Sequence, residues 1–278
     1  MTLRQLVQFA VSVSLIACST AFPTRRGNHL DIVVVEGPPK PELYGLELSA
    51  AQDVLAILHQ LLGEPPSKPT DLQAARDELD DIKKRLGRED MLSLLAGDIR
   101  SGENFWRETA ANASGIFVPA RTVVRGLGAL DLLNRTSFTA WLLNAGAGYP
   151  NALTKGHPYL YLEIMNTVDG KPASEVVESL GGGPIAHYMG GPTERQSFMP
   201  ELPDYPTQII LAFTLLDGTL ATYTHIASRD VSDGLELYLA VWLPDSTPSY
   251  IIKGEVEQLT IQLANWLQLA YSDLISGV

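Results

Sequence analysis

The stretch TQIILAFTLLDGTLATYTHIAS, residues 207–228, contains the clearest fold signal in the chain. Apolar and β-branched residues alternate on both sides of Asp217 and Gly218, and an Asp-Gly pair between two such runs is typical of a two-residue type I′ hairpin. A loop of these two residues fixes the register, because it places Ile209 opposite Ile226. We therefore predict an antiparallel hairpin with one aliphatic face and one face of mixed aromatic and polar side chains.

Apolar and polar residues alternate in a similar way before and after this hairpin. The alternation begins behind the turn-like residues that follow Lys155. Short apolar runs bounded by Gly, Pro and Asp are typical of strands in an antiparallel sheet. A β-branched run at 32–35 is compatible with one further strand. The predicted strands cover residues 159–166, 174–180, 184–189, 207–216, 219–228 and 235–243.

Two capping boxes predict helices before the sheet. The first, Ser49 to Gln52, precedes an apolar stripe that ends at Gly63, and the second, Thr70 to Gln73, precedes a stripe that ends at Gly87. Each stripe has apolar residues three or four positions apart, so each helix buries one side. We predict a helical hairpin with a charged, solvated outer face.

The rest of the first half contains weaker helical patterns, and the C-terminus contains a strong one. One weak pattern runs through Val123, Val124, Leu127, Leu130 and Leu133, and another contains Phe138, Trp141 and Leu142. At the C-terminus, Thr247 and Pro248 are typical of a helix start, and apolar residues then repeat every three or four positions as far as Gly277.

These elements predict an α+β protein. The prediction places a loose segment at 22–42 before a single domain over 43–278, which is helical over 43–150. An antiparallel sheet of about six strands then follows, with a long amphipathic C-terminal helix packed on one sheet face, over 151–278.

Residues 1–21 have the features of a cleavable signal peptide. Arg4 precedes an apolar stretch that is too short to span a bilayer, and Ser19 and Ala21 form a small-x-small cleavage site. A competing interpretation makes Leu15 to Cys18 a bacterial lipoprotein box, with a lipid on the single cysteine of the chain. We predict secretion with cleavage near Ala21.

Two sequons and the charge balance refine the predicted setting. Asn112 and Asn134 each begin an N-x-S/T tripeptide, so both are candidate glycosylation sites. The chain carries 20 basic and 32 acidic residues, and this excess argues against nucleic acid or an anionic membrane as a partner. The sequence has no second hydrophobic span, so stable insertion into a membrane is not expected.

The sequence contains no motif of a known catalytic class. It lacks a G-x-S-x-G elbow and an H-E-x-x-H pair, and its five histidines show no metal-ligand spacing. No metal and no cofactor are therefore expected.

A candidate site follows from the predicted sheet. If all the aliphatic faces pack under the C-terminal helix, the opposite face is either an ordinary packed or half-exposed surface or a concave pocket lined by aromatic side chains. In a pocket, His225 would act as a general acid or base, with Tyr223 or Glu163 as its partner. The predicted ligand-contacting residues are Tyr161, Tyr238, Trp242 and His187.

The second half resembles a group of uncharacterised small secreted proteins of filamentous fungi. The resemblance covers about residues 130–278 and depends on Leu153 to Pro158, on Asp217 to Thr219, and on Asn265-Trp266. It implies a secreted fungal protein with a place in specialised metabolism, and it transfers no catalytic residue.

Two functional hypotheses follow. The first is a secreted protein that binds a small apolar metabolite and catalyses cofactor-free proton transfer on it, such as isomerisation, dehydration or cyclisation. The alternative is a non-enzymatic secreted interaction or effector protein that meets its partner through the helical hairpin.

Overall fold

A computed structural model describes residues 30–129, 131–146, 151–168 and 171–277. The predicted leader at 1–21, with its two cleavage interpretations, lies outside the described residues. The centre of the fold is an eight-stranded antiparallel sheet in the order β1-β2-β8-β7-β6-β5-β4-β3. The strands are β1 (Asp31–Glu36), β2 (Phe117–Leu127), β3 (Leu160–Val168), β4 (Lys171–Glu178), β5 (Ala186–Pro192), β6 (Thr207–Leu215), β7 (Leu220–Val231) and β8 (Gly234–Pro244).

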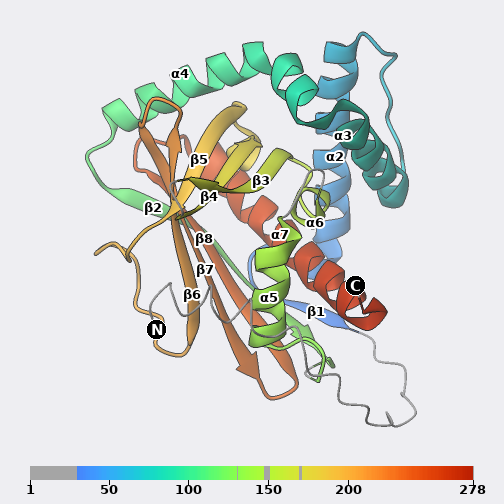
Figure 1. Cartoon of the computed structure of the whole chain (residues 1–278), viewed down its shortest axis with the longest axis vertical. Helices are drawn as coiled ribbons and strands as arrows, with labels where there is room; N and C mark the ends of the chain where they lie inside the picture. The colour runs from blue at the N-terminus through green and yellow to red at the C-terminus, as the bar shows by residue number, and fades with distance from the viewer. Residues whose placement is uncertain (1–29, 130, 147–150, 169–170, 278) are drawn as a thin grey trace.

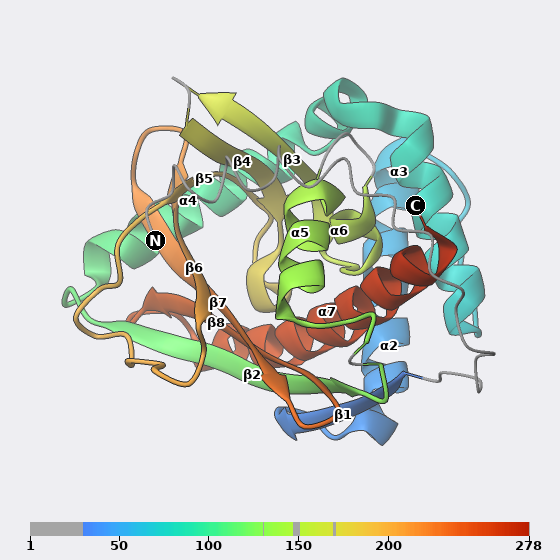
Figure 2. The same ribbon diagram turned by 60° about the horizontal axis from the view of Figure 1, so that its bottom comes forward.

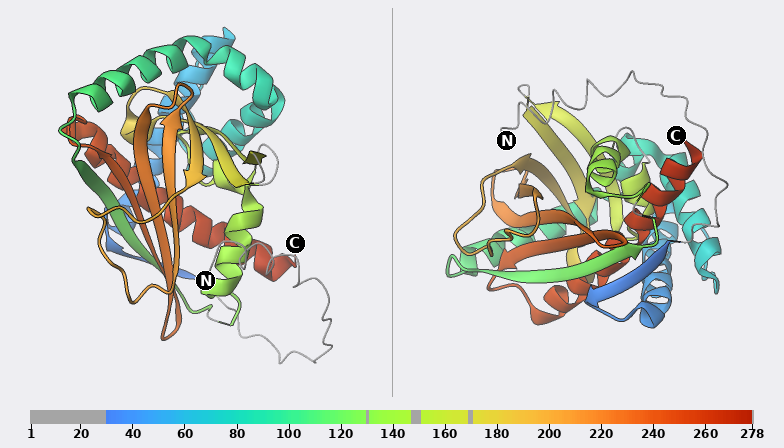
Figure 3. Two further views of the ribbon diagram at one scale, coloured as in Figure 1. Left: turned by 60° about the vertical axis from the view of Figure 1, so that its left-hand side comes forward. Right: turned by 90° about the horizontal axis from the view of Figure 1, so that it is seen from below.

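Helices surround this sheet, and the α+β class is confirmed. The long helix α7 lies along one side of the sheet, with the hairpin of α2 and α3 beside it (Figures 1 and 2). Helix α4 spans from the hairpin across the sheet at β5 (Figure 3). The helical elements are α2 (Lys40–Leu62), α3 (Leu72–Leu94), α4 (Ala96–Asn112), α5 (Arg135–Ala145), α6 (Ala152–Lys155), the 3₁₀ turn η1 (Leu180–Gly182) and α7 (Ser249–Ser276).

The six predicted strands correspond to the consecutive meander β3 to β8, and β2 is the strand that the prediction missed. Residues 117–127 pair with both β1 and β8, although a helix was predicted through Val123 and Leu127. Both sheet faces are covered here, because Val124 packs in the core with α7 and Val123 packs on the opposite side. Val123 and Val124 are adjacent and buried on opposite faces, and together with Leu127 they fit a helical spacing as well as a strand, so periodicity alone does not distinguish the two.

The helical hairpin is confirmed, but its helices start at other residues than predicted. Helix α2 begins at Lys40, within the segment predicted to be loose, because Pro41 occupies the first turn, where no backbone donor is needed. In α3, the Asp71 carboxylate caps the helix by accepting from the Ala74 amide at 3.0 Å. Gly87, with φ 66° and ψ −173°, has a non-helical backbone, so the first helical segment of α3 ends there as predicted, and a second segment continues to Leu94 after the kink.

The β6–β7 hairpin has the predicted pairing in its body and a different turn. Ile209 lies opposite Ile226, as predicted. The loop contains three residues, because the Gly218 amide donates to the Leu215 carbonyl and the Leu215 amide donates to the Thr219 carbonyl, both at 2.9 Å. Gly218 has φ 86°, so this turn contains a glycine bulge that shifts the pairing by one residue near the tip.

The two sheet faces have different covers. One face, which includes Leu237 and Leu239, packs against α7 in the main core. On the opposite face, the hairpin covers the β3–β4 end through Leu162 and Val177, and the segment 193–206 covers the end formed by β2, β8 and β7. The aliphatic side of β3 therefore faces the hairpin instead of α7.

Candidate functional site

Four of the predicted site residues remain together on the face that points away from α7. Tyr223, His225, Tyr238 and Trp242 lie on adjacent strands there. Phe198 of the covering segment packs on this group, with its ring centroid 5.4 Å from that of Trp242 and 5.7 Å from that of Tyr223. Together with Met199 and Tyr205, it makes this region an aromatic core.

His225 lies inside this core. Its Nε2 is 3.0 Å from Gln208 Oε1, and its ring packs edge-on against Tyr238. Burial lowers the pKa of His225 to about 4, so the imidazole is neutral at pH 7. A general acid or base works best with a pKa near the working pH, so this environment favours a packing role for His225.

The other predicted site residues lie elsewhere. Tyr161 is fully buried in the hairpin core. His187 Nε2 is 3.0 Å from Glu175, a carboxylate that also binds Arg88. Glu163 lies on the α7 side, because its partner Val176 packs in the main core. Different elements pack on the two faces of the sheet. They separate residues that the alternation within each strand predicted to lie together.

The two sequons lie at helix ends. Asn112 is the exposed last residue of α4, and its site for a glycan is open to solvent. Asn134 caps α5 by accepting from the amides of Thr136 and Ser137, at 3.0 Å and 3.1 Å. Asn112 is therefore the more accessible of the two candidate sites.

Glu163 belongs to an acidic cluster, formed with Glu178 and Glu255, on the side of the sheet that faces α7. Burial raises the pKa of Glu163 to about 7 and that of Glu255 to about 8. The pKa of Glu178 also lies well above its usual range, first through burial and then through the charges of Glu255 and Glu163. The Oε2 atom of Glu255 accepts from the Gly181 amide at 2.6 Å. These carboxyl groups therefore retain protons near neutral pH.

The acidic cluster predicts a pH-dependent stability. The pKa of Glu255 is about 8 in the folded state against 4.5 for an ordinary glutamate, so its contribution is complete below pH 4.5 and is lost as the pH rises through 8. One pKa unit corresponds to about 1.4 kcal/mol, so the free energy of unfolding of wild type relative to Glu255→Gln should fall by roughly 4 kcal/mol between pH 4.5 and pH 8.5. Urea titrations at several pH values measure this difference. Glu108→Gln, at an exposed site on α4, controls for the change in net charge, and a pH-independent difference would contradict the prediction.

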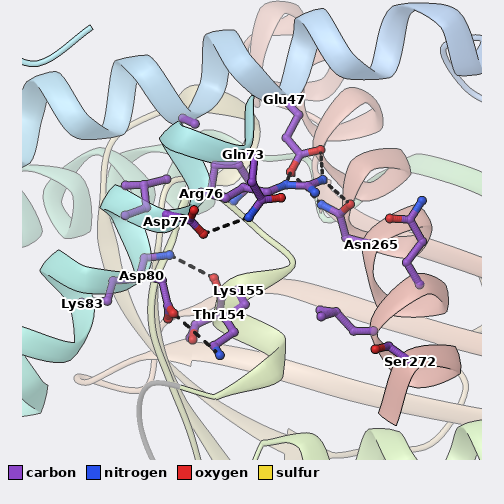
Figure 4. Close-up of a pocket in the computed structure, with 15 residues that line it drawn as sticks. Glu47, Gln73, Arg76, Asp77, Asp80, Lys83, Thr154, Lys155, Asn265 and Ser272 are labelled. Carbon is purple, nitrogen blue, oxygen red and sulfur yellow. Dashed lines mark hydrogen bonds and ion pairs between the residues drawn. The ribbon is translucent and has the colours of Figure 1, made fainter. Parts of the chain in front are cut away.

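A groove runs between α3, α6 and α7 and has a volume of about 400 Å³ (Figure 4). A second hollow, also of about 400 Å³, lies between α2 and α7 and shares Glu47, Arg76 and Asn265 with the first. Both volumes lie within the range of small-molecule sites. The lining combines apolar side chains, such as Leu79 and Leu269, with amides and charged groups.

A hydrogen-bonded network forms the boundary between the two hollows. Glu47 is buried and accepts from Arg76 Nε and Nη2, both at 2.7 Å. Asn265 of α7 accepts from Arg76 Nη2 at 2.8 Å and donates to Glu47 at 2.9 Å and to the Gly156 carbonyl at 3.0 Å. This bidentate arrangement ties α2, α3 and α7 together and fixes the groove wall.

Lys83 is the buried cation of the groove. Its side chain extends from α3 and is 3% exposed, and its Nζ donates to the carbonyl oxygens of Thr154 at 3.0 Å and His157 at 3.5 Å. Burial lowers the pKa of Lys83 to about 7. Burial also lowers the pKa of the neighbouring His157 to about 3, with a smaller contribution from the Lys83 charge. Both protonation states of Lys83 are thus accessible at neutral pH.

The two carboxylate oxygens of Asp80 differ in their surroundings. Oδ2 lies 2.5 Å from Lys84 Nζ and 3.7 Å from Lys155 Nζ. Oδ1 is buried and has no hydrogen-bond partner among the described residues. An acceptor without a donor is costly when buried, and it marks a position where a ligand or water would be stabilised.

The sequence interpretation missed this groove, although one signal was present. Lys83 follows Ile82 and lies four residues after Leu79, so it falls within the apolar stripe of α3. A charged residue on a buried stripe is unusual and requires a partner or a function. The role of Glu47 had no comparable signal, because the start of α2 was not recognised.

Among the residues that the structure describes, no group of three or more His, Cys, Asp or Glu side chains is arranged to hold a metal ion. Within the same part of the chain, no helix combines the length and the apolar character needed to cross a bilayer.

Comparisons with known proteins give distant structural likenesses. No family model and no curated protein matches the chain. Five chains of solved structures match, and one of them is the di-domain ARO/CYC StfQ from the steffimycin biosynthetic pathway, with a TM-score of 0.36 and 14% sequence identity. The match covers 76% of this chain and 64% of the StfQ chain, so it spans less than two thirds of that protein. At this distance the likeness carries no information about function.

Proposed function

We propose that this chain is a secreted protein that binds a small organic molecule in the groove and catalyses cofactor-free proton transfer on it, with Lys83 as the proton-exchanging group. The observation that supports this proposal is the buried Lys83 side chain in the lining of a groove large enough for a ligand. A pKa of about 7 equips the same nitrogen to accept and return a proton near neutrality.

The lining indicates the kind of ligand. Leu79, Leu269 and Pro158 offer apolar surface, and Gln73 and Gln268 offer amide donors and acceptors. Small-molecule sites commonly combine apolar walls with a few polar groups that fix orientation. The expected ligand is therefore a compound with an apolar body and at least one carbonyl or hydroxyl group, instead of a purely apolar metabolite.

The proposed reaction begins with neutral Lys83. Its amine takes a proton from the carbon next to a ligand carbonyl, and the electron pair of that C–H bond moves to the carbonyl oxygen to form an enolate. Lys155 lies in the same groove and contributes positive charge that favours this anion. The Lys83 ammonium then returns the proton to another atom of the ligand, which completes an isomerisation without a cofactor.

The alternative of a partner-binding hairpin has less support. Val54, Leu58 and Leu79 belong to the apolar stripes of α2 and α3, and all three are buried in the hairpin core. A protein partner would therefore meet the outer face, where Tyr44 and Leu61 are the exposed large apolar side chains among charged and polar residues. Secretion and a fungal origin stay predictions from the leader and from the resemblance of the second half.

A carbonyl-compound screen tests the proposal. Ligands are first found by thermal shift, and exchange of their α-proton with deuterium is then followed by NMR. Lys83→Met retains most of the side-chain volume and removes the exchangeable amine, so the exchange rate should fall at least about 100-fold. Lys253→Met, at an exposed site on α7, is the matched control and should leave the rate unchanged. Unaltered exchange in Lys83→Met would refute this role.

A further inference from the structure

We propose that Lys83 also forms a covalent imine with an aldehyde or ketone bound in the groove. This inference depends on the proposed function in one respect, because it requires the groove to admit a carbonyl compound. It goes further by giving Lys83 a nucleophilic role and by narrowing the ligand to compounds with a reactive aldehyde or ketone.

The hydrogen bonds of Lys83 match a neutral amine. Its Nζ has two acceptors among the described residues, the carbonyl oxygens of Thr154 and His157. A neutral amine has two hydrogens and one lone pair, whereas an ammonium has three donors. The two carbonyls therefore satisfy both hydrogens of the neutral form and leave its lone pair free. In the ammonium form, a third N–H would lack an acceptor in the described part of the chain.

The position of the nitrogen makes the lone pair usable. Figure 4 shows the Lys83 side chain pointing from α3 toward the segment that carries Thr154, at the wall of the groove. The two carbonyl acceptors come from α6 and from the residues just after it, so they hold Nζ in place. A nucleophile with a fixed position and reduced protonation is the arrangement that imine-forming lysines require. The pKa of about 7 supports the same conclusion, since about half of Lys83 is neutral at pH 7.

The chemistry of the step balances. The lone pair of Nζ attacks the carbonyl carbon, a C–N bond forms as the π bond of the carbonyl breaks, and one of the two amine protons moves to the oxygen to give a neutral carbinolamine. The nitrogen then loses its remaining proton as the hydroxyl group leaves with a proton as water, and a C=N bond forms. Asp80 lies one helical turn before Lys83, and its negative charge favours the positively charged nitrogen that forms when the amine attacks. The net change is amine plus carbonyl to imine plus water, with no oxidant or reductant.

Reductive trapping tests the inference on the folded, full-length protein. The protein is incubated with benzaldehyde and sodium cyanoborohydride at pH 7, and the modified lysines are located by peptide mass spectrometry. An exposed lysine has a pKa near 10.4, so roughly one in 2,500 is neutral at this pH. Lys83 should therefore be labelled at least about tenfold faster than Lys253, the exposed control. In urea, which unfolds the protein, this preference for Lys83 should disappear. Equal labelling of Lys83 and Lys253 in the folded protein would overturn the proposed imine.

A second arm separates the imine from the binding site itself. Benzamide has a similar size and shape but forms no imine, so it should raise the Tm and slow the trapping of Lys83 if both occupy the groove. An unlabelled Lys83 together with a Tm raised by benzamide would overturn the imine and retain the groove as a ligand site. An unlabelled Lys83 with an unchanged Tm would overturn both the imine and the binding of such compounds.

Discussion

Gly254→Ala is expected to lower the free energy of unfolding by at least about 3 kcal/mol, although alanine is normally the better helix former. Gly254 lies in α7, and a Cβ atom there would be 2.3 Å from the carbonyl oxygen of Gly181 in η1. In return, a Cβ on Gly181 would be 2.0 Å from the Ile251 carbonyl oxygen. Both obstacles are backbone atoms, so the helix and the turn must separate to admit the methyl group.

The same junction holds buried polar groups, which increases the expected loss. The Gly181 amide donates to Glu255 at 2.6 Å and to Gln258 at 3.0 Å, and both acceptors belong to α7. Separation of η1 from α7 would leave these groups buried without partners, and each such group costs about 1–3 kcal/mol.

A matched glycine provides the control. Gly45 lies inside α2, and a Cβ there would meet no atom within 4 Å. Gly45→Ala should therefore stabilise the protein by about 0.5–1 kcal/mol. Urea unfolding measures the free energy of unfolding of both variants. It should fall for Gly254→Ala and rise for Gly45→Ala if the contact between η1 and α7 is as tight as described. Equal stability of Gly254→Ala and Gly45→Ala would contradict it.

Arg76→Met is expected to lower the free energy of unfolding by about 3–5 kcal/mol and to remove ligand binding in the groove. The variant leaves the buried Glu47 carboxylate without its bidentate partner, and among the described residues only Asn265 still donates to it. An uncompensated buried charge is far more costly than a missing surface ion pair. The loss of the network also frees α2, α3 and α7 to shift, so the boundary between the two hollows is no longer fixed.

A double-mutant cycle separates these contributions. Glu47→Gln in the Arg76→Met background removes the stranded charge and should recover a large part of the lost stability. Arg100→Met, at an exposed site on α4, is the control for loss of a guanidinium and should change the stability by no more than about 0.5 kcal/mol. Additive effects of the Arg76 and Glu47 substitutions, measured by urea titration, would show that the two side chains are not coupled.

The parts of the fold that were predictable from the sequence are those with strong local patterns. The Asp217-Gly218 turn gave the pairing of Ile209 with Ile226, and the apolar repeat up to Gly277 gave the C-terminal helix. Strand β2 was not predictable in the same way, because Val123, Val124 and Leu127 have a spacing that fits a helix as well as a strand.

The site was harder to predict than the fold, since it depends on which surfaces meet. Alternation grouped Glu163 with His225, but the packing of the hairpin on one face and of α7 on the other separates them. The segment that carries Phe198 has no regular pattern, so its place over Trp242 could not be inferred. Lys83 was identifiable as a charge within an apolar stripe, but its cavity exists only where three helices meet.

The strand order has a consequence for how the chain folds. Strands β3 to β8 follow one another in both sequence and space, so each pairing closes only a short stretch of chain. Strand β2 pairs with β8 across more than a hundred residues, as with Ala120 and Val241, and that closure carries the larger entropy loss. Until β2 pairs with β8, the edge of β8 exposes unpaired backbone groups and side chains that are buried in the folded protein. A neighbouring chain can then bind to this edge. This long-range closure is therefore the step of sheet assembly at which self-association competes with folding.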